Sequence, residues 1–572
     1  MMFAHRIGVR HLVPLLALGL IVGLWLQARP QAAEAAQAVD WSIAGHVLDR
    51  QGEPIRDAEL ALLVNDLDTP ITQTLSEPDG TYLLVLPSDL DIQSARIEIT
   101  RPHFQSYEWL PTSDELTVLQ GHDSLTIADF VLDRRFTAGF WIAGGTFLIM
   151  LLTIATERLH NTLAALLGIV IIFGVSFVGG AITPDLYILD FERALAYVDF
   201  NVIFLLMGMM IMIGIIEETG IFQWLAYQAY RLSGGRAWLL TVILMLITAI
   251  VSALLDNVTT MLLMTPITLQ IALALEVEPL ALILPEVMAS NVGGISTLIG
   301  TPTNILIGSY AGLGFNEFLV NLTPGVLLAL AALIGYMLLR YRKEYRRAGT
   351  GISESLLARL KVNARIKDPD RLKKSGIVFS GILVLFVVGE HFHLVPAVTA
   401  LMGAVFMLLW IRPDIEQMLH AVDWTTLLFF IGLFMVIGAV QEVGMISIIA
   451  GWVGDLVGAR LVVAVLVLVW IAAFLSGVIA NIPFTAAMLP LVRYLTRTIP
   501  GAGSQVLFYS LSIGSAMGGN TTLIGASANM VTAGITQRAG YPITFKNFAI
   551  VGLPATLITV GVGCGWLLLH FL

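Results

Sequence analysis

The chain has 572 residues, of which 57% are hydrophobic and only 13% are charged, and its mean hydropathy is +0.84. Soluble domains carry about a quarter charged residues, so the composition excludes a soluble protein over most of the length and predicts a polytopic membrane protein. The net charge of −10 argues against a nucleic-acid partner. The single cysteine, Cys564, excludes an internal disulfide and a cysteine-rich metal site.

Residues 1–30 contain Arg6 and Arg10, followed by an apolar run from Leu12 to Leu26 and then by small residues. A basic start, a short apolar core and small flanking residues are typical of a secretory signal peptide. An uncleaved anchor helix fits the same pattern. Under either interpretation, the polypeptide that follows lies outside the cytoplasm.

Residues 41–133 differ from the rest of the chain, because short alternating runs are separated by turn signals such as QGEP and PDG. This pattern predicts a small antiparallel β-sandwich. The stretch GHVLDRQGEPI, followed by DGTYLL, resembles the transthyretin-like, carboxypeptidase-regulatory type of module. Asp79 and Gly80 are expected in a hairpin, and His46 and His103 in ordinary strands or loops. We expect a structural or partner-binding role for this module rather than chemistry.

Uncharged apolar runs of membrane-spanning length recur from about residue 136 to the C-terminus. One basic segment interrupts them, because Arg340 to Lys374 contains twelve Lys or Arg residues and four acidic ones. The positive-inside rule assigns this segment to the cytoplasm. We therefore expect a first membrane repeat at 136–341, a cytoplasmic linker at 342–374 and a second membrane repeat at 375–572.

The two membrane segments are copies of one sequence. DFNVIFLLMGMMIMIGIIEETG, which begins at Asp199, matches DWTTLLFFIGLFMVIGAVQEVG, which begins at Asp423, 224 residues later. SALLDNVTTMLLMTP from Ser252 matches SGVIANIPFTAAMLP from Ser476 at the same offset. The shared residues include Gly, Asn, Ser and Pro, which chance similarity between apolar helices does not explain. An odd number of membrane crossings separates matched points, so the copies are expected to be inverted.

The polar stretch NVGGISTLIGTPTN, from Asn291 to Asn304, matches the later AMGGNTTLIGASAN at seven of fourteen positions. So many glycines and polar residues at membrane depth predict a broken helix, because unwound backbone is tolerated there only inside protein or beside a cavity. We expect half-helices at 280–290 and 304–312, joined by an unwound segment at 291–303.

The segment 252–266 is too polar at its centre for a plain membrane span, which predicts a re-entrant hairpin. Asp256 and Asn257 occupy its tip, and Ala480 and Asn481 stand at the equivalent positions of the second copy. Two hairpin tips that meet two helix breaks would enclose one central site. Inverted repeats with broken helices at the bilayer midplane are the architecture of secondary transporters.

Four stretches resemble the ion transporter superfamily, and its P-protein branch in particular: LLDNVTTMLLMTPITL, SNVGGISTLIGTPTN, ANIPFTAAMLP and GGNTTLIGASANMVTAGI. The superfamily also includes arsenite permeases, sodium–proton antiporters, and citrate and dicarboxylate carriers. The resemblance covers residues 136–572. It implies a polytopic all-α membrane fold with two inverted repeats, re-entrant hairpins and broken helices, here joined to the N-terminal β-sandwich module. It also implies a scaffold that often dimerises and a transport part that moves like an elevator.

Two departures from the superfamily concern the substrate. In the dicarboxylate branch, a Ser-Asn-Thr triplet at each hairpin tip binds carboxylate and sodium. The triplets here are DNV, from Asp256, and ANI, from Ala480, so only the asparagines carry over, which argues against a dicarboxylate. Relatives often have Asp-Pro-Pro-Asn after the first helix break, where this chain has TPTN, from Thr301, and so lacks that carboxylate.

Two carboxylates, Asp256 and Glu286, are expected at membrane depth. An ionised carboxylate there is unfavourable by about 3 kcal/mol on insertion scales, so such residues usually have a partner or a function. Their counterparts in the second copy, Ala480 and Leu511, are uncharged. We hypothesise that the first repeat binds the coupling cation, H⁺ or Na⁺, and that the second completes the substrate site. A neutral acid in a structural hydrogen bond is the alternative.

The predicted ion and substrate site combines hairpin-tip residues, buried acids and polar residues of both helix breaks. Its members are Asp256, Asn257, Glu286, Asn291, Gly294, Ser296, Thr297, Gly300, Thr301, Asn304, Asn481, Gly519, Asn520, Thr521, Thr522, Gly525, Ser527 and Asn529. A Na⁺ ion is assigned to Asp256, Asn257, Thr297 and Thr301. No catalytic residue and no cofactor are predicted. Glu217, Glu218 and Glu442 are expected near helix ends at the membrane interface, and EHFH, from Glu390, as an exposed loop rather than a metal site.

The sequence therefore predicts a secondary active transporter that couples H⁺ or Na⁺ to the movement of a small inorganic or carboxylate anion by an alternating-access, elevator-like mechanism. A Na⁺/H⁺ antiporter is the alternative, because titrating acids can exchange protons for sodium. A membrane-anchored structural or receptor protein is a third class, although it gives no reason for paired broken helices. The chain is not expected to be an enzyme, and the absence of a Walker motif argues against direct coupling to ATP within this chain.

The expected location is the bacterial cytoplasmic membrane, with the β-module outside the cytoplasm and the linker inside it. The expected partners are the transported ion, the lipid bilayer and a second copy of the chain. Arg231, Arg236 and Arg412 fall on the cytoplasmic side in this orientation, whereas Arg493 and Arg497 fall on the outer side and disagree with it.

Overall fold

The computed structural model describes residues 41–50, 52–64, 69–86, 95–110, 126–127, 129–156, 158–347, 362, 364–458 and 460–572. The segment expected to be a signal peptide or anchor lies outside the described residues, as does much of the expected linker. The chain divides into two compact units, Met1–Arg135 and Phe136–Leu572, which are described separately below.

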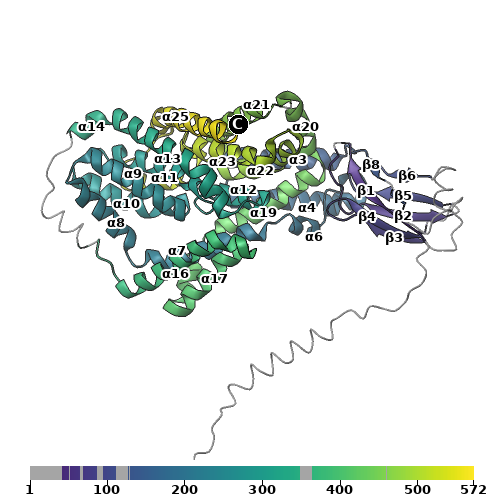
Figure 1. Cartoon of the computed structure of the whole chain (residues 1–572), viewed down its shortest axis with the longest axis horizontal. Helices are drawn as coiled ribbons and strands as arrows, with labels where there is room; N and C mark the ends of the chain where they lie inside the picture. The colour runs from purple at the N-terminus through teal and green to yellow at the C-terminus, as the bar shows by residue number, and fades with distance from the viewer. Residues whose placement is uncertain are drawn as a thin grey trace, which may run out of the picture. The chain divides into compact units, whose positions relative to one another are not determined.

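The N-terminal unit consists of two small β-sheets that share one apolar core (Figure 1). Its strands are β1 (Trp41–Asp49), β2 (Glu59–Val64), β3 (Thr72–Leu75), β4 (Thr81–Leu86), β5 (Ala95–Thr100), β6 (Tyr107–Trp109), β7 (Thr126–Ile127) and β8 (Phe130–Leu132). One sheet has the order β4-β1-β7, with β8 also paired to β1, and the other has the order β3-β2-β5-β6. Along β4, Tyr82, Leu84 and Leu86 are buried whereas Leu83 and Val85 are exposed, as the period-2 alternation of a half-buried strand predicts.

The predicted hairpin before β4 is present. Gly80 has φ +79°, a conformation that glycine adopts readily. Asp79 Oδ1 accepts hydrogen bonds from Thr81 Oγ1 (2.6 Å) and Thr81 N (3.0 Å), and the Thr81 hydroxyl lowers the pKa of the Asp79 carboxyl. The expectation of a purely antiparallel module is wrong, because β1 pairs in parallel with β7 and β8.

The second unit is helical, and ten of its described helices are long and apolar enough to cross a membrane. They are α3 (Ala138–Ala155), α4 (Asn161–Phe173) with its short continuations η3 (Gly174–Gly179) and α5 (Gly180–Ile182), α7 (Phe200–Glu217), α9 (Ala237–Leu254), α10 (Asn257–Ala274), α13 (Phe315–Arg340), α16 (Pro369–Val388), α19 (Trp424–Glu442), α21 (Leu461–Val478) and α25 (Phe545–Phe571).

Shorter helices complete the unit. They are η4 (Pro184–Leu186), α6 (Phe191–Ala196), α8 (Ile221–Ser233), α11 (Leu280–Gly293), η5 (Gly294–Ser296), α12 (Pro302–Ala311), α14 (Arg342–Arg347), η6 (Gly389–Phe392), α17 (Pro396–Ile411), α18 (Ile415–His420), α20 (Met445–Val457), α22 (Asn481–Thr498), η7 (Ala502–Ser504), α23 (Val506–Gly518), η8 (Leu523–Gly525) and α24 (Ser527–Arg538).

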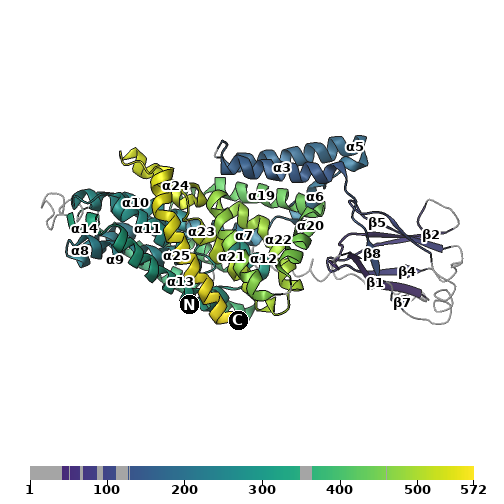
Figure 2. The same cartoon turned by 90° about the horizontal axis from the view of Figure 1, so that it is seen from above.

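Two groups of helices pack mainly among themselves (Figures 1 and 2). In the first, α9 packs on α11, α21 on α23, α13 on α25, and α10 on α24; we call α9–α13 with α21–α25 the hairpin group. In the second, α7 packs on α17, α4 on α19 and α3, and α16 on α17; we call α3, α4, α7, α16, α17 and α19 the framework group. Each group contains helices from both sequence copies.

The sequence repeat is visible as repeated local structure. Asp199 caps the N-terminus of α7, and Asp423 caps that of α19, each by accepting bonds from the backbone N–H groups two and three residues ahead. After these helices, Gly220 and Gly444 have φ +80° and +84°. The two copies therefore begin and end this helix by the same devices.

The expected helix breaks are present with shifted boundaries. α11 continues through Asn291 and ends at Gly293, not at residue 290, and a single 3₁₀ turn follows. α12 begins at Pro302, two residues earlier than expected, because Thr301 accepts the Asn304 N–H as an N-cap and proline suits the first helical position. The unwound backbone is thus shorter than the polar stretch that predicted it.

Candidate ion and substrate site

In the first break, between α11 and α12, one asparagine replaces the missing helical hydrogen bonds. Asn304 Nδ2 donates to the carbonyls of Ile295 (3.0 Å) and Thr297 (2.8 Å). The Thr297 hydroxyl donates to the carbonyl of Ala253 at the end of α9. The freed carbonyls are therefore satisfied inside the protein, as unwound backbone at membrane depth requires.

The second break, between α23 and α24, uses the same devices. Asn529 Nδ2 donates to the carbonyls of Gly519 (2.8 Å) and Thr522 (3.0 Å). The Thr522 hydroxyl donates to the carbonyl of Gly477 at the end of α21 (2.5 Å). The shared threonines and asparagines of the repeat thus hold the breaks together.

Four predicted site glycines serve close backbone packing. A Cβ at Gly294 would lie 2.6 Å from the carbonyl oxygen of Gly300, and one at Gly525 would lie 2.7 Å from that of Gly519. Neither break has room for a side chain at these positions. The prediction that glycine lets the backbone approach an ion stays a prediction, because the close neighbour here is backbone.

The two breaks meet through a buried network of carboxamides. Asn291 Nδ2 donates to Asn520 Oδ1 (2.8 Å) and to Asn529 Oδ1 (2.9 Å). Asn257, beside the first hairpin tip, donates from Nδ2 to Asn291 Oδ1 (2.7 Å). Each of these side chains belongs to a residue that is at most 3% exposed. The network joins one hairpin and both breaks, so these predicted residues do come together.

A cavity of about 1070 Å³ lies beside this junction. Its lining includes both hairpin tips, Asp256 and Ala480, and the starts of both second half-helices, Pro302 and Ser527. The opposite wall comes from the framework group, with residues of α4, α7 and the first turn of α19. Six helices, α4, α10, α12, α19, α22 and α24, begin at this cavity.

Asp256 has a structural task at the cavity. Its Oδ1 accepts the Thr259 N–H (2.9 Å) and its Oδ2 accepts the Thr259 hydroxyl (2.6 Å), so it caps α10. A carboxylate at a helix N-terminus is stabilised by the helix dipole. Of the other residues assigned to Na⁺, Asn257 and Thr297 bond to protein groups as described, and Thr301 Oγ1 lies 2.9 Å from Thr303 Oγ1.

Glu286 lies apart from the cavity. It is fully buried in α11, and its Oε1 accepts a hydrogen bond from Thr248 Oγ1 of α9 (2.9 Å). It does not line either of the two cavities described here. The structure thus separates the two acids that the sequence grouped into one site.

The remaining predicted residues divide between the junction and its surroundings. Asn481 is 4% exposed and begins α22. The Thr521 hydroxyl donates to Thr556 of α25 (3.2 Å), away from the junction. Ser296 contributes its carbonyl, which accepts the Thr323 hydroxyl (3.1 Å).

Sequence reasoning missed a layer of buried serines. Ser252 Oγ donates to the Ser290 carbonyl (2.9 Å), and Ser476 Oγ donates to the Ser515 carbonyl (2.6 Å). These bonds hold the hairpins against α11 and α23. Ser512 Oγ donates to Asn304 Oδ1 (2.6 Å) and links the two copies. The shared position of Ser252 and Ser476 in the repeat was the available signal.

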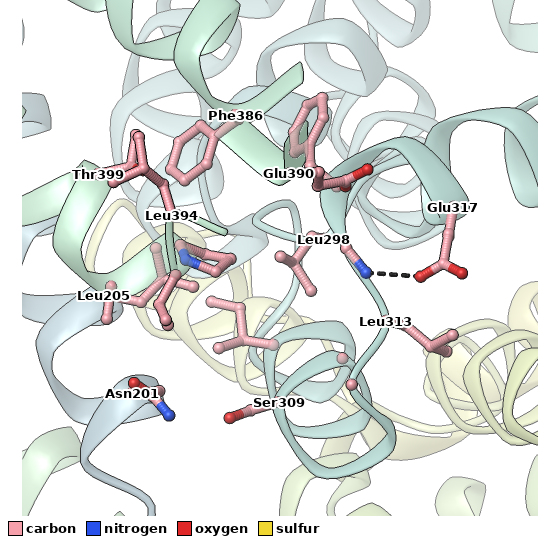
Figure 3. A pocket seen from close by; sticks show the side chains of 18 of the residues that line it. Asn201, Leu205, Leu298, Ser309, Leu313, Glu317, Phe386, Glu390, Leu394 and Thr399 are labelled. Atoms are coloured by element: carbon pink, nitrogen blue, oxygen red, sulfur yellow. Dashed lines mark hydrogen bonds between the residues drawn. The ribbon is translucent and has the colours of Figure 1, made fainter. Parts of the chain in front are cut away.

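A second cavity, of about 500 Å³, lies at the other end of α7 (Figure 3). It is lined by Asn201, Ser309, Glu317 and Glu390, among others. Glu390 accepts hydrogen bonds from Asn316 N and Nδ2 (both 3.0 Å) at the start of α13. Within the described residues, no group of three or more His, Cys, Asp or Glu side chains could hold a metal ion.

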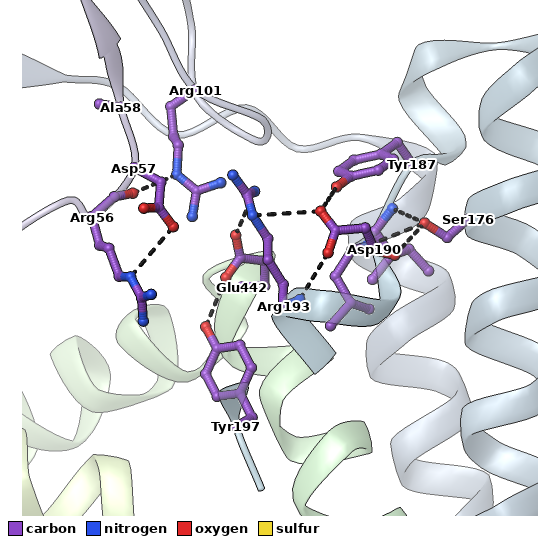
Figure 4. Close-up of polar contacts among 12 residues, drawn as sticks. Arg56, Asp57, Ala58, Arg101, Ser176, Tyr187, Asp190, Arg193, Tyr197 and Glu442 are labelled. Atoms are coloured by element: carbon purple, nitrogen blue, oxygen red, sulfur yellow. Dashed lines mark hydrogen bonds and ion pairs between the residues drawn. The ribbon is translucent and has the colours of Figure 1, made fainter. Parts of the chain in front are cut away.

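Glu442 is the last residue of α19, near a helix end as expected, and its location at the membrane interface stays a prediction (Figure 4). Its side chain is 6% exposed, and Arg193 NH1 lies 3.3 Å from its Oε1. The Tyr197 hydroxyl donates to its Oε2 (2.7 Å). Glu218, the equivalent residue of the first copy, pairs with Arg371. Both acids stand at helix C-termini, where the helix dipole disfavours them, so each arginine stabilises an unfavourable placement.

The geometry can be compared with known proteins. A family model described as a citrate transporter, CitMHS, matches residues 151–514, which is more than half of the chain. This chain belongs to the CitMHS citrate transporter family. As a family member it is an integral membrane transporter and not an enzyme, and its apolar helices agree with this assignment.

Relatives of this chain include bacterial and animal proteins. A protein of Mycobacterium tuberculosis named as an uncharacterized transporter is 35% identical over 432 residues, covering 75% of this chain and 98% of the relative. The human P protein is 34% identical over 493 residues, covering 72% of this chain and 58% of the P protein. The resemblance to the P-protein branch is confirmed.

A solved structure shows the same fold. The YdaH transporter of Alcanivorax borkumensis matches with a TM-score of 0.50 at 15% identity, covering 72% of this chain and 98% of the YdaH chain. At this identity the likeness concerns the fold alone. The polytopic, mostly helical architecture is therefore confirmed for the CitMHS protein.

Proposed function

We propose that this protein is a secondary active transporter that moves a small inorganic or carboxylate anion together with H⁺ or Na⁺ by alternating access. Its family is described as citrate transporters, so citrate is the first anion to test. Inorganic anions are the next group, because the hairpin tips lack the triplets of dicarboxylate carriers.

One observation carries the anion part of this proposal. α22 and α24 begin at the large cavity with Ala480 and Ala526 at their N-cap positions, and no side chain among the described residues caps either helix. In the first copy the equivalent caps are Asp256 and Thr301. The first N–H groups of a helix have no intrahelical partner, and the helix dipole adds partial positive charge there. Two uncapped N-termini on one cavity favour an anionic group.

Inverted copies and an elevator-like movement complete the proposal. The matching hydrogen bonds of the two breaks support a duplicated unit, and its inversion follows from the odd number of crossings between matched points. The separate packing of the hairpin group and the framework group supports a movement of one against the other. In this scheme the framework group of two copies forms a homodimer, and the hairpin tips re-enter the membrane.

The two cavities support alternating access because they lie at opposite ends of α7. Glu217, at the C-terminal end of α7, lines the large cavity. The nearby Thr219 carbonyl accepts the Lys367 N–H (2.9 Å) from the basic segment. The positive-inside rule places that segment in the cytoplasm, so the large cavity would face the cytoplasm. The mycobacterial relatives support a bacterial cytoplasmic membrane. In this proposal the β-module lies outside the cytoplasm.

Flux measurements test this proposal. Purified full-length protein would be reconstituted into liposomes with imposed H⁺ and Na⁺ gradients, and uptake of citrate, phosphate and chloride would be compared with empty liposomes. We expect one anion to accumulate when a cation gradient is imposed, and the accumulation to collapse when the gradient is dissipated. No gradient-driven uptake of any small anion would contradict the proposal.

Na⁺/H⁺ antiport is the second candidate, because three carboxylates, Asp256, Asp423 and Glu217, line the large cavity. The same liposomes distinguish the two functions. An antiporter exchanges Na⁺ for H⁺ in the absence of any transported anion, whereas the proposed transporter moves the cation only when the anion is present.

A further inference from the structure

Glu286 is a buried acid that neither cavity uses. Glu286 is fully buried in the middle of α11, and it forms no ion pair in the described part of the chain. Thr248, in the middle of α9, donates its hydroxyl to Glu286 Oε1 (2.9 Å). On the other side, Glu286 Oε2 and the hydroxyl of Thr268 in α10 are adjacent and buried, yet neither has a hydrogen-bond partner of normal geometry among the described residues. A buried oxygen without a hydrogen-bond partner is unfavourable, because its desolvation is not compensated.

The equivalent residues of the second copy show that apolar side chains are sufficient to pack these three helices together. The residues equivalent to Thr248, Thr268 and Glu286 are Ala472, Val492 and Leu511, and all three are fully buried. The helices that carry them, α21, α22 and α23, match α9, α10 and α11 in length and order. The same architecture is therefore stable with an apolar cluster here, so the polar cluster of the first copy requires another explanation.

Thr248 and Thr268 lack the local hydroxyl bond that several other helical threonines of this chain make, and Thr485 of α22 likewise has no partner among the described residues. Thr241, Thr496 and Thr559 donate their hydroxyls to the carbonyl four residues earlier in their own helices, which is the usual local bond of a buried helical threonine. Thr248 instead donates to Glu286, and the Thr268 hydroxyl makes no such bond. Both hydroxyls are thus available to the carboxyl group.

The helices around Glu286 carry other ionisable groups, which stand at helix ends or have partners of their own except for Cys564, inside α25. They are Arg236 before α9, Asp256 before α10, Glu276 and Glu278 before α11, Glu317, Tyr336 and Arg340 of α13, Tyr341 and Tyr345 near α14, Tyr509 of α23, Arg538 of α24, and Lys546, Cys564 and His570 of α25. Tyr345 donates to the Ala281 carbonyl, which Pro285 leaves without its helical donor, and Tyr336 donates to the Val551 carbonyl. No charge on these groups is paired with the Glu286 carboxyl in the described residues.

We infer that Glu286, held between Thr248 and Thr268, is the buried site that binds the coupling proton. That the bound proton is coupled to transport rests on the proposed function. That Glu286 binds a proton rests on the geometry of the cluster alone. Binding forms one O–H bond on Glu286 Oε2, which then donates to the Thr268 hydroxyl, and neutralises the carboxylate. Both unpartnered oxygens become satisfied, and no other reactant is needed.

A proton fits this cluster better than Na⁺. Hard cations in proteins take about six oxygen ligands. The cluster offers two carboxyl oxygens and two hydroxyls. All three residues lie inside helices, whose backbone carbonyls bond within the helix except where Pro266 and Pro285 remove a donor, and the Ala281 carbonyl freed by Pro285 accepts the Tyr345 hydroxyl. A proton needs one oxygen to bind, here Glu286 Oε2, and one nearby oxygen to accept the resulting O–H hydrogen bond, here the Thr268 hydroxyl. The cluster is also closed in this conformation, so loading and release require α9 and α10 to separate from α11.

Infrared spectroscopy tests the proton site without relying on transport. On acidification, purified full-length protein should show the carbonyl stretch of a buried protonated carboxylic acid, and Glu286→Gln should lack it. Glu278→Gln, which removes an exposed acid before the same helix, is the matched control and should retain it. Persistence of the band in Glu286→Gln, or its absence from the wild type across the pH range of stability, would overturn the inference.

Proteoliposomes that contain a pH-sensitive dye test the coupling. In wild-type liposomes, anion uptake should acidify the lumen, and replacing Na⁺ by choline should change nothing. Glu286→Gln should exchange anion across the membrane with at least tenfold less proton movement. The triple variant Thr248→Ala, Thr268→Val, Glu286→Leu, which copies the second half, should behave likewise and fold stably. Undiminished proton movement in either variant would overturn the inference, whereas a wild type that moves no anion would refute the proposed function and leave the infrared result to judge the site.

Discussion

Asn257, Asn291, Asn520 and Asn529 form one buried carboxamide network, in which the side chain of Asn291 is shared by helices from both copies. Each oxygen and nitrogen that is buried here needs a partner, and the other members of the network supply it. The two central members are not repeated, because the counterparts of Asn291 and Asn520 are Ala516 and Ile295. The asparagines hold the two breaks together beside the large cavity and do not line it.

Replacing Asn291 should destabilise the junction strongly. In Asn291→Ala, three neighbouring carboxamides each lose a hydrogen-bond partner in a buried place, so we expect the free energy of unfolding to fall by about 2–4 kcal/mol. The unfolding transition in detergent measures this effect. Asn547→Ala, at an exposed position of α25, is the control and should change little. Equal stability of the two variants would show that the network is not required.

Ala480 tests the anion site at the scale of one side chain. Ala480→Asp would copy Asp256 and place a negative charge at the start of α22, so we expect the bound anion to lose at least about tenfold in affinity, or 1.4 kcal/mol. Ala480→Ser offers an uncharged cap of similar size and should stay within about twofold of the wild type. Citrate binding to the purified variants measures both. Unchanged affinity in Ala480→Asp would exclude this end of α22 from the site.

At the scale of elements, each helix break depends on close contact between two helices, α11 with α9 in the first copy and α23 with α21 in the second. A Cβ at Gly293 would lie 2.5 Å from the Ala249 backbone of α9, and one at Gly518 would lie 2.5 Å from the Ala473 carbonyl oxygen of α21. Glycine at the ends of α11 and α23 therefore lets the paired helices touch. The hydroxyls of Ser252 and Ser476 then bridge the same pairs.

Gly293→Ala should separate α11 from α9. Overpacking against backbone costs about 1–3 kcal/mol, so we expect a lower unfolding temperature. Gly335→Ala is the matched control, because that glycine lies on an exposed face of α13 with nothing within 4 Å of the added Cβ. The control should gain up to about 1 kcal/mol from helix propensity. A destabilised control with an unaffected Gly293→Ala would contradict the packing argument.

The sequence predicted these elements because each depends on a local signal. Glycine, proline and asparagine at membrane depth indicate a break, and Asp256 before a run of helix-forming residues indicates a hairpin tip. It did not predict that Asn291 remains helical. A helical asparagine can use its side chain to bond to a neighbouring element while its backbone keeps the helical hydrogen bonds. The sequence also grouped Asp256 with Glu286, although the structure places one at a cavity and the other behind it, because burial of a helical residue depends on which neighbours pack on each face.

At the scale of the whole molecule, two copies of one unit form a hairpin group and a framework group, with a large cavity at the junction of the breaks. The capping residues of the first copy and the alanines of the second give this cavity two unlike sides. The polar cluster around Glu286 is likewise present in one copy only. These differences between the two copies are what the proposed binding of two ligands, an anion and a proton, requires.

Thiol labelling of single cysteines tests most directly whether the anion binds at the junction. The native Cys564 is the chain's one cysteine, so Cys564→Ala provides a background for Ser527→Cys in the large cavity and Ser309→Cys in the second cavity. The account predicts that the transported anion slows labelling at position 527 at least tenfold and leaves position 309 unprotected. Labelling at position 527 that is equally fast with and without the anion would contradict it.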